Sequence, residues 1–372
     1  MTPRARRNGL GAATVVAVAL TAMALLPTCH AFSSLEDCDS DADCSAGRVC
    51  EPRAKRCVPR ADASTAPDAS DAGSDAPRDS GSDGPPGVPC EDLPWGEPVP
   101  VAGLEDELIV SARLSPDELT MMISHGVPPS FTDIYTVTRP DAGAPFRVVG
   151  PLPVVNEAAS AEFWPSLSAD GRLMFFESSR SRVPDDAGVY QNEVTRIWSA
   201  SRVNVATDFD KPRLQTLFDV AGPEAAPYLH PSGRSVYFAS FSRPGKGQLD
   251  VWVAEIDGFG VVTSIHAVDA VNTESDENAP VVTLDDRFLY HNRPGDGGAQ
   301  NDVWVSRRAK PGDAFPESTR VAELSSADDD YPSWVSGDHC RFYLTSSRPV
   351  PGRALDASPP GAFHLFVATR KR

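Results

Sequence analysis

Acidic and arginine side chains recur along this chain at matching positions, and they are the residues best suited to chemistry. Each acid stands three residues before a proline, and each arginine follows an aromatic-rich run. Carboxylates held near one another can cleave glycosidic bonds by acid–base catalysis, whereas an arginine fork beside a carboxylate forms an ion pair. We therefore expect either structural ion pairs or the charged rim of a ligand site, formed by Glu162, Glu224, Glu277, Asp329, Arg180, Arg243, Arg293 and Arg348.

A sequence repeat positions these side chains. Each unit has a short strand, a turn of Asp, Gly or Ser type and a second strand rich in aromatic and branched residues. A third strand follows with an aromatic residue at a fixed place, and a fourth apolar run separates the units. We expect the recurring aromatic side chains to form core. The first two strands span 112–125, 165–178, 227–240, 280–293 and 332–345, and the aromatic residues are Tyr135, Trp198, Trp252, Trp304 and Phe366.

Five such units predict an all-β fold, a five-bladed β-propeller over residues 90–372. Four antiparallel strands per unit, repeated at this period, are typical of that fold. The fifth unit ends after its third strand, whereas the domain begins with an unpartnered run at 95–104. We expect that run to supply the missing outer strand and close the ring without an exposed edge. A disulfide between Cys90 and Cys340 would then lock the closure.

The propeller places the acids and arginines on one face. The loop that enters the inner strand and the loop between the second and third strands open on the same side of such a ring. The charged residues are therefore expected to surround one mouth of the central channel. The long loops 181–196 and 349–363 would form its variable walls, and loops on a rigid scaffold are where recognition usually resides.

The repeats resemble those of TolB-like, WD40-like propellers. The shared pattern is a proline, Ser-x-Asp-Gly, an aromatic strand ending in Ser-x-Arg, and Asp-aliphatic-aromatic; residues 165–180 read PSLSADGRLMFFESSR. The resemblance spans about 105–372, but the turn pair becomes Asp117–Glu118 in the first repeat and Gly337–Asp338 in the fifth. Family members usually have six blades, so five is a departure. The resemblance implies an exported bacterial scaffold, often a protein-binding platform in the envelope, rather than an enzyme.

Residues 1–31 have the pattern of a secretory signal peptide. Three arginines precede an uncharged apolar run at 12–26, which is shorter than the roughly 20 residues of a membrane-spanning helix. Cleavage after Ala31 would release a soluble protein. Cleavage before Cys29, with a lipid on its sulfur, would tether the chain to a membrane.

Residues 32–60 are expected to form a small disulfide module, and 61–89 a disordered linker rich in Asp, Ala, Ser, Pro and Gly. The module has few apolar side chains around its cysteines, so two disulfides are the expected support in an exported chain. The spacing is wider than that of most zinc ligands. The module resembles short four-cysteine modules of secreted myxobacterial proteins. Cys29 is then left for a lipid, since the module uses Cys38, Cys44, Cys50 and Cys57.

The negative net charge of the chain limits the classes of partner that it can bind. At a formal net charge of −18, the chain is poorly suited to nucleic acid or anionic lipid. It has no Gly-x-Ser-x-Gly, His-Glu-x-x-His or phosphate-loop motif, and we expect no cofactor and no metal. We expect a monomeric, exported propeller, periplasmic, secreted or tethered at the outer membrane or cell surface, that binds or scaffolds an envelope or extracellular protein. The alternative is a glycan-binding or glycan-cleaving propeller that uses the acids at the channel mouth.

Overall fold

The structure is a computed structural model that describes two units, within residues 1–78 and 79–372. In the first unit, β1 (Arg48–Glu51) and β2 (Arg56–Pro59) pair antiparallel. The predicted signal peptide with Cys29, the cysteines Cys38 and Cys44 and most of the predicted linker lie outside the described residues. Among the residues that are described, no helix is long and apolar enough to span a membrane. The described ranges are 48–51, 56–59, 88–126, 132–185, 190–295, 298, 300–352 and 362–371.

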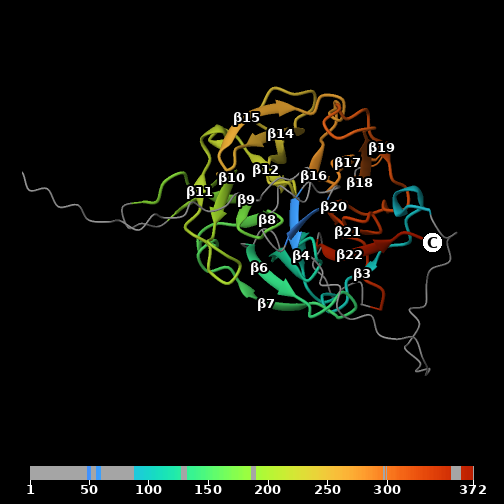
Figure 1. The fold of residues 1–372 in the computed structure, drawn as a ribbon. Helices are drawn as coiled ribbons and strands as arrows, with labels where there is room; N and C mark the ends of the chain where they lie inside the picture. The colour runs from blue at the N-terminus through green and yellow to red at the C-terminus, as the bar shows by residue number, and fades with distance from the viewer. Residues whose placement is uncertain are drawn as a thin grey trace, which may run out of the picture. The chain divides into compact units, whose positions relative to one another are not determined.

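The second unit is a five-bladed β-propeller, as predicted. Five four-stranded sheets surround one axis, and the first strand of each lies nearest the centre (Figure 1). Blades 1 to 3, from inner to outer strand, are β4 (Ile109–Leu114), β5 (Thr120–His125), β6 (Asp133–Thr138) and β7 (Arg147–Pro151); β8 (Glu162–Leu167), β9 (Leu173–Arg180), β10 (Asn192–Ser201) and β11 (Arg213–Leu214); and β12 (Glu224–Leu229), β13 (Ser235–Ser240), β14 (Asp250–Ile256) and β15 (Val262–Ala267). Blades 4 and 5 are β16 (Asn278–Val282), β17 (Phe288–Pro294), β18 (Asn301–Arg307) and β19 (Thr319–Arg320); and β20 (Asp330–Val335), β21 (Arg341–Ser346), β22 (His364–Thr369) and β3 (Val99–Pro100).

The N-terminal segment of this unit closes the ring, as predicted. The outer strand β3 pairs antiparallel with β22, the last strand of the chain, and a further bridge joins Trp95 to Arg370. The short helix η2 (Cys90–Asp92) precedes this segment. Cys90 is bonded to Cys340 in blade 5, with Cα atoms 5.1 Å apart. The last blade is therefore assembled from both ends of the propeller sequence.

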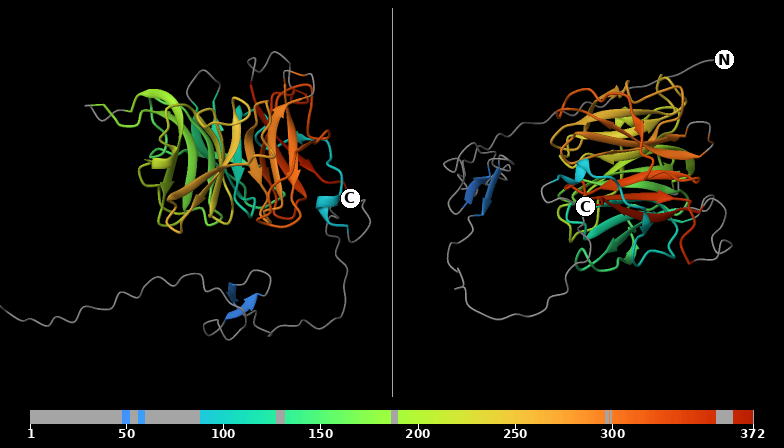
Figure 2. Two further views of the ribbon diagram at one scale, coloured as in Figure 1. Left: turned by 90° about the horizontal axis from the view of Figure 1, so that it is seen from above. Right: turned by 90° about the vertical axis from the view of Figure 1, so that its right-hand side faces the viewer.

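The core lies between neighbouring blades, whose sheets pack face to face in the two edge-on views of Figure 2. Trp198, Trp304 and Phe366 are buried, at 6% exposed or less, whereas Tyr135 and Trp252 are partly buried. The inner strands are buried on both faces, and all six residues of β12 are buried. The alternating branched and aromatic residues of the repeat thus supply the packing between blades.

The hairpin turns between the first two strands share one backbone conformation. Gly171 and Gly233 have φ of +67° and +69°, which glycine adopts at little cost. The other three blades place Glu118, Asp286 and His339 in the same region, at φ of 59°, 58° and 60°. The turn geometry is therefore kept in the repeats that lack the Gly.

The fifth repeat lies one residue away from the register that its sequence suggested. Its turn is Asp338–His339 rather than Gly337–Asp338, because His339 takes the positive φ. In addition, Ser336 donates a hydrogen bond to Asp338, as the Ser–Asp pair of the blade 2 turn does. This shift also changes the acid of the fifth repeat, as described below.

Candidate functional site

Three of the four predicted acid–arginine pairs form, the fourth arginine pairs with an adjacent acid, and all four pairs lie inside the blades. Each joins the beginning of the inner strand to the end of the second strand of the same sheet. The acid side chains are fully buried. The nitrogen–oxygen distances are 2.9 Å for Glu162–Arg180, 3.2 Å for Glu224–Arg243, 3.8 Å for Glu277–Arg293 and 2.5 Å for Asp330–Arg348.

Blade 2 shows how such a pair is built. Ser178 donates to Oε1 of Glu162 at 2.8 Å, and Arg180 also donates to the carbonyl of Val155 in the segment arriving from blade 1. The Arg180 guanidinium lies 5.3 Å from the ring centroid of Trp198. One arginine therefore connects three strands of its blade to the preceding connection. Similar ring contacts recur in Arg243–Trp252, Arg293–Trp304 and Arg348–Phe366.

The acid of the fifth repeat is Asp330, not Asp329 as the sequence pattern indicated. Asp329 is half-buried and accepts hydrogen bonds from Asn301 instead. The proline that guided the prediction, Pro332, is displaced because the bulge of β20 begins after this residue, whereas the bulge of β8 includes the proline itself. A difference of one residue in bulge position thus changes which of two adjacent acids enters the blade.

Burial governs the chemistry of these acids. It raises the pKa of Glu162 and Glu277, and it raises the pKa of Glu224 to about 7, although the neighbouring arginines oppose the change. These carboxylates are fully buried and face no open solvent. Of the two predicted interpretations, this geometry supports structural ion pairs.

A different set of residues surrounds the opposite mouth of the ring, where the turns between first and second strands lie. An axial cavity opens there, and the centre of a water molecule can occupy about 50 Å³ of it. All five blades contribute to the wall, which includes Arg113, Ser166, Tyr228, Leu284 and Trp334. The wall is mainly apolar, and Arg113 brings a charge to it.

A groove between blades 1 and 2 lies beside this cavity. The two hollows share the wall residues Pro116, Leu167 and Ala169. The groove offers about 770 Å³ to the centre of a water molecule. It runs along β5, β6 and β7 of blade 1 and reaches the loop that follows β10, where Val205 is 65% exposed. The turn face therefore carries two adjacent hollows that share part of their walls.

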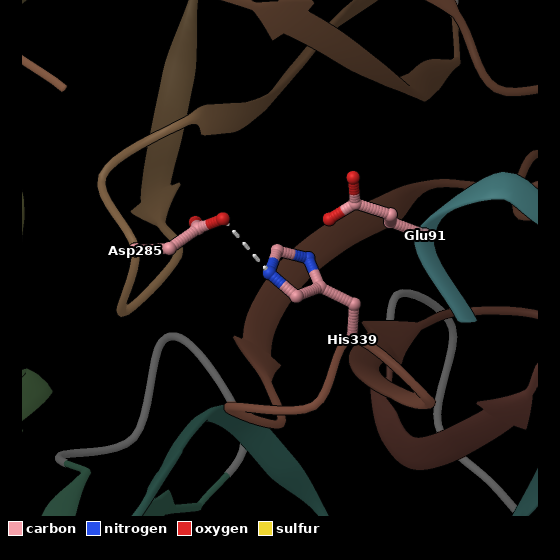
Figure 3. Close-up of side chains that lie close together, drawn as sticks. All are labelled: Glu91, Asp285 and His339. Atoms are coloured by element: carbon pink, nitrogen blue, oxygen red, sulfur yellow. Dashed lines mark ion pairs between the residues drawn. The ribbon is translucent and has the colours of Figure 1, made fainter. Parts of the chain in front are cut away.

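A third cluster fixes the closing segment against blades 4 and 5. Figure 3 shows Glu91, Asp285 and His339 close together, and Nε2 of His339 lies 3.3 Å from Asp285. One potential metal-ligand atom from each residue lies within 4.8 Å of the others. However, Glu91 already pairs with Arg287 and Arg307, both at 3.0 Å. Two guanidinium groups offset the two carboxylates, so an ion network accounts for the cluster.

Comparisons with known proteins find similarity at the level of fold. No protein-family model and no curated protein sequence matches the chain. TolB from Acinetobacter baumannii is 15% identical, covering 71% of this chain and 56% of its own, with a TM-score of 0.40. A putative TolB from Agrobacterium tumefaciens is 16% identical, covering 72% and 91%, with a TM-score of 0.38.

An alpha-L-arabinofuranosidase from Podospora anserina is similar to a comparable degree. It is 12% identical, covers 77% of this chain and 98% of its own, and has a TM-score of 0.42. The chain spans 56% of the length of the Acinetobacter protein. Similarities of this size assign no activity, and the class of fold rests on the five sheets described above.

Sequence reasoning did not identify Arg113, although the repeat contains the signal. Arg113 stands two residues before the turn serine of blade 1. The equivalent inner-strand positions of the other blades hold the neutral residues Ser166, Tyr228, Val281 and Trp334. A single charged residue at an otherwise neutral register position marks a place where one blade differs from its neighbours.

Proposed function

We propose that this protein is an exported binding module that holds a segment of an envelope or extracellular protein on its turn face. The observation that carries the proposal is that the inter-blade groove and the axial cavity lie side by side and share three wall residues. A hollow of this length accommodates an extended segment, and recognition commonly uses loops held on a rigid scaffold. The resemblance of the repeats to TolB-like propellers supports the same role.

The groove indicates the chemistry of its occupant. Val149 and Val205 are 67% and 65% exposed in its walls, so apolar side chains have surface to cover there. Asp117, Asp170 and Asp208 add negative charge along it, and the whole chain carries a formal net charge of −18. Such a field attracts cationic partners. The proposed occupant is a protein segment that alternates apolar and basic side chains.

The glycan-cleaving alternative is less well supported. It needs carboxylates that reach the substrate from two sides. Glu162, Glu224 and Glu277 are instead buried and paired with arginines. A binding role for the turn face places no such demand on them.

Site-specific photo-crosslinking tests the protein-binding role. A crosslinker at Val205 in the groove should capture a discrete partner from envelope extracts, and Asp208→Arg should reduce that capture at least fivefold by reversing the charge. A crosslinker at Val183, which is 71% exposed and follows β9 on the opposite face, is the matched control. Equal capture from both positions, or none from Val205, would reject the groove. Retention on a polysaccharide array without a captured protein would favour glycan binding.

We further propose that a lipid on Cys29 tethers the chain to a membrane after export. Cys29 remains once the six other cysteines are assigned to disulfides, and the 61–89 linker would hold the propeller away from the surface. Metabolic labelling with a fatty acid should mark the wild-type protein and not Cys29→Ser. Label that survives this substitution would remove the proposed anchor.

A further inference from the structure

Arg113 is a buried cation with unused hydrogen-bond donors. The residue is 2% exposed. Its Nη1 donates to the carbonyl oxygens of Ser333 at 2.6 Å and Ala112 at 3.0 Å. Within the described part of the chain, neither Nε nor Nη2 has a hydrogen-bond partner. Buried charged groups with unpaired donors are costly, so this arrangement calls for a ligand that completes it.

The surroundings of Arg113 do not neutralise its charge. Among the described residues that line the cavity, Arg113 alone is charged. Its guanidinium lies 5.3 Å and 5.2 Å from the ring centroids of Trp164 and Tyr228, and such contacts hold the group in place. Burial lowers the pKa of Arg113 to about 10, which still leaves it protonated at neutral pH.

We propose that Arg113 anchors a carboxylate-binding site at the base of the axial cavity. The Nε–H and Nη2–H bonds lie on one edge of a guanidinium and point the same way, which is the geometry that accepts a carboxylate through two parallel hydrogen bonds. This is the edge that Arg113 leaves unused. A carboxylate carries one negative charge, which matches the single positive charge of the cavity. A doubly charged phosphate would exceed it.

The groove beside the cavity favours the carboxylate at the end of a protein chain. A segment lying in the groove between blades 1 and 2 reaches the cavity past Pro116 and Leu167, which line both. The chain terminus is the one backbone position that carries a carboxylate. This choice of source rests on the protein-binding function proposed above, whereas the carboxylate site itself does not.

Binding should be visible in tryptophan fluorescence. The two free donors of Arg113 are covered by neighbouring atoms, so a carboxylate reaches them when a side chain of the wall shifts. Trp164 lies against the guanidinium and Trp334 lines the cavity. An acid that enters the site therefore changes the environment of these indole rings, and a titration gives its dissociation constant.

Sodium acetate is the first probe, and full-length protein is the sample. At ten times its dissociation constant, acetate should raise Tm by about 3 °C relative to sodium chloride at equal ionic strength. Arg113→Met should abolish this increase, and its Tm without acetate should be no lower than that of wild type, because the change removes an unmatched buried charge. Arg172→Met, at an exposed arginine on the same face, should keep the full response. Arg113→Lys, which retains the charge without the fork, should bind at least tenfold more weakly.

Three results would overturn the carboxylate site. They are equal stabilisation of wild type by chloride and acetate, an acetate response that persists in Arg113→Met, and a wild type that shows neither a Tm shift nor a fluorescence change. The last result, combined with a lower Tm for Arg113→Met, is the behaviour of an arginine that serves only packing.

A peptide pair identifies the source of the carboxylate. Lys-Ala-Ala-Ala as the free acid should bind at least tenfold more tightly than acetate, and the same peptide with a C-terminal amide should not compete with acetate. Equal affinity of acetate and the peptide acid would retain the site and overturn the chain terminus as its ligand. A positive acetate titration together with a failed crosslink at Val205 would retain the site and reject the protein-binding function.

Discussion

At the scale of single residues, burial shifts the pKa of a glutamate that also joins two blades. Glu177 on β9 is 7% exposed and accepts a hydrogen bond from the backbone N–H of Ala226 at 3.0 Å. Ala226 has φ of +49° in the bulged inner strand of the next blade. Burial raises the pKa of Glu177 to about 7. This carboxyl therefore links two blades while favouring its protonated form.

Glu177→Gln should flatten the pH dependence of stability. The folded protein binds this proton more tightly than the unfolded chain, so the contribution of Glu177 to stability is greatest below the unfolded pKa of 4.5 and is lost as pH rises towards about 7. The loss amounts to at most roughly 3 kcal/mol. Thermal melts between pH 4.5 and 8 should show a smaller decrease for Glu177→Gln, whose amide oxygen can still accept from Ala226.

Glu97→Gln, at an exposed glutamate, is the control and should follow the wild-type profile. If Glu177→Gln loses as much stability as wild type between pH 4.5 and 8, the carboxyl does not titrate in this range.

At the scale of elements, bulges and ion pairs hold each blade to its neighbours. In β8 the bulge turns the backbone N–H of Trp164 towards blade 1, where it donates to the hydroxyls of Ser111 and Ser124, both at 3.0 Å. The pair of Glu162 and Arg180 then connects the same inner strand to the outer part of its sheet. Glu162, which the sequence offered as a candidate acid for glycan cleavage, thus holds the strands of its blade together.

Removing the charge of one partner of this pair should lower the free energy of unfolding more than removing the charges of both. Arg180→Met leaves the buried Glu162 carboxylate without its cation, and we expect a loss of about 3–5 kcal/mol in the free energy of unfolding. The double variant Glu162→Gln with Arg180→Met should recover at least about 1 kcal/mol of this, since no unpaired charge remains. Urea denaturation measures both values. Loss of glycan hydrolysis in Glu162→Gln at unchanged stability would instead assign a catalytic role to the acid.

At the scale of the whole propeller, closure depends on a short strand. Only Val99 and Pro100 form β3, and further main-chain hydrogen bonds join Gly96 to Thr369 and Val101 to Leu365 on either side of it. The disulfide from Cys90 to Cys340 and the pairing of Glu91 with arginines of blade 4 add to it. Main-chain, covalent and ionic contacts therefore secure the closure together, and Trp95 and Val101 add buried apolar surface to it.

Cys340→Ser should lower Tm because the disulfide spans a sequence separation of 250 residues. Loop-entropy reasoning gives an upper value on the order of 5 kcal/mol for such a crosslink. The double variant of Cys90→Ser and Cys340→Ser should have the same Tm as Cys340→Ser alone, since neither can form the disulfide. Peptide mapping without reduction should recover the joined Cys90 and Cys340 peptides from wild type. Free thiols at both positions would contradict the pairing.

The fold was largely readable in advance because a propeller repeats its local signals. Hairpin turns, strands of alternating apolar residues and a recurring aromatic are properties of short segments, and five copies reinforce one another. The error of one residue at Asp329 arose where this local rule fails. In β20 the proline stands two residues after the buried acid, one position before the bulged residue, whereas in β8 it stands three residues after the acid and within the bulge, so the proline does not mark the same place in both.

The sequence alone determined the number of blades, the closing segment and the partners of three ion pairs, because each follows from spacing along the chain. Only the tertiary structure decided that those pairs are enclosed and that Arg113 faces an axial cavity without a counter-charge. Solvent exposure and electrostatic environment depend on atoms brought together from all five blades. The spacing of residues along the sequence does not show which side chains meet there.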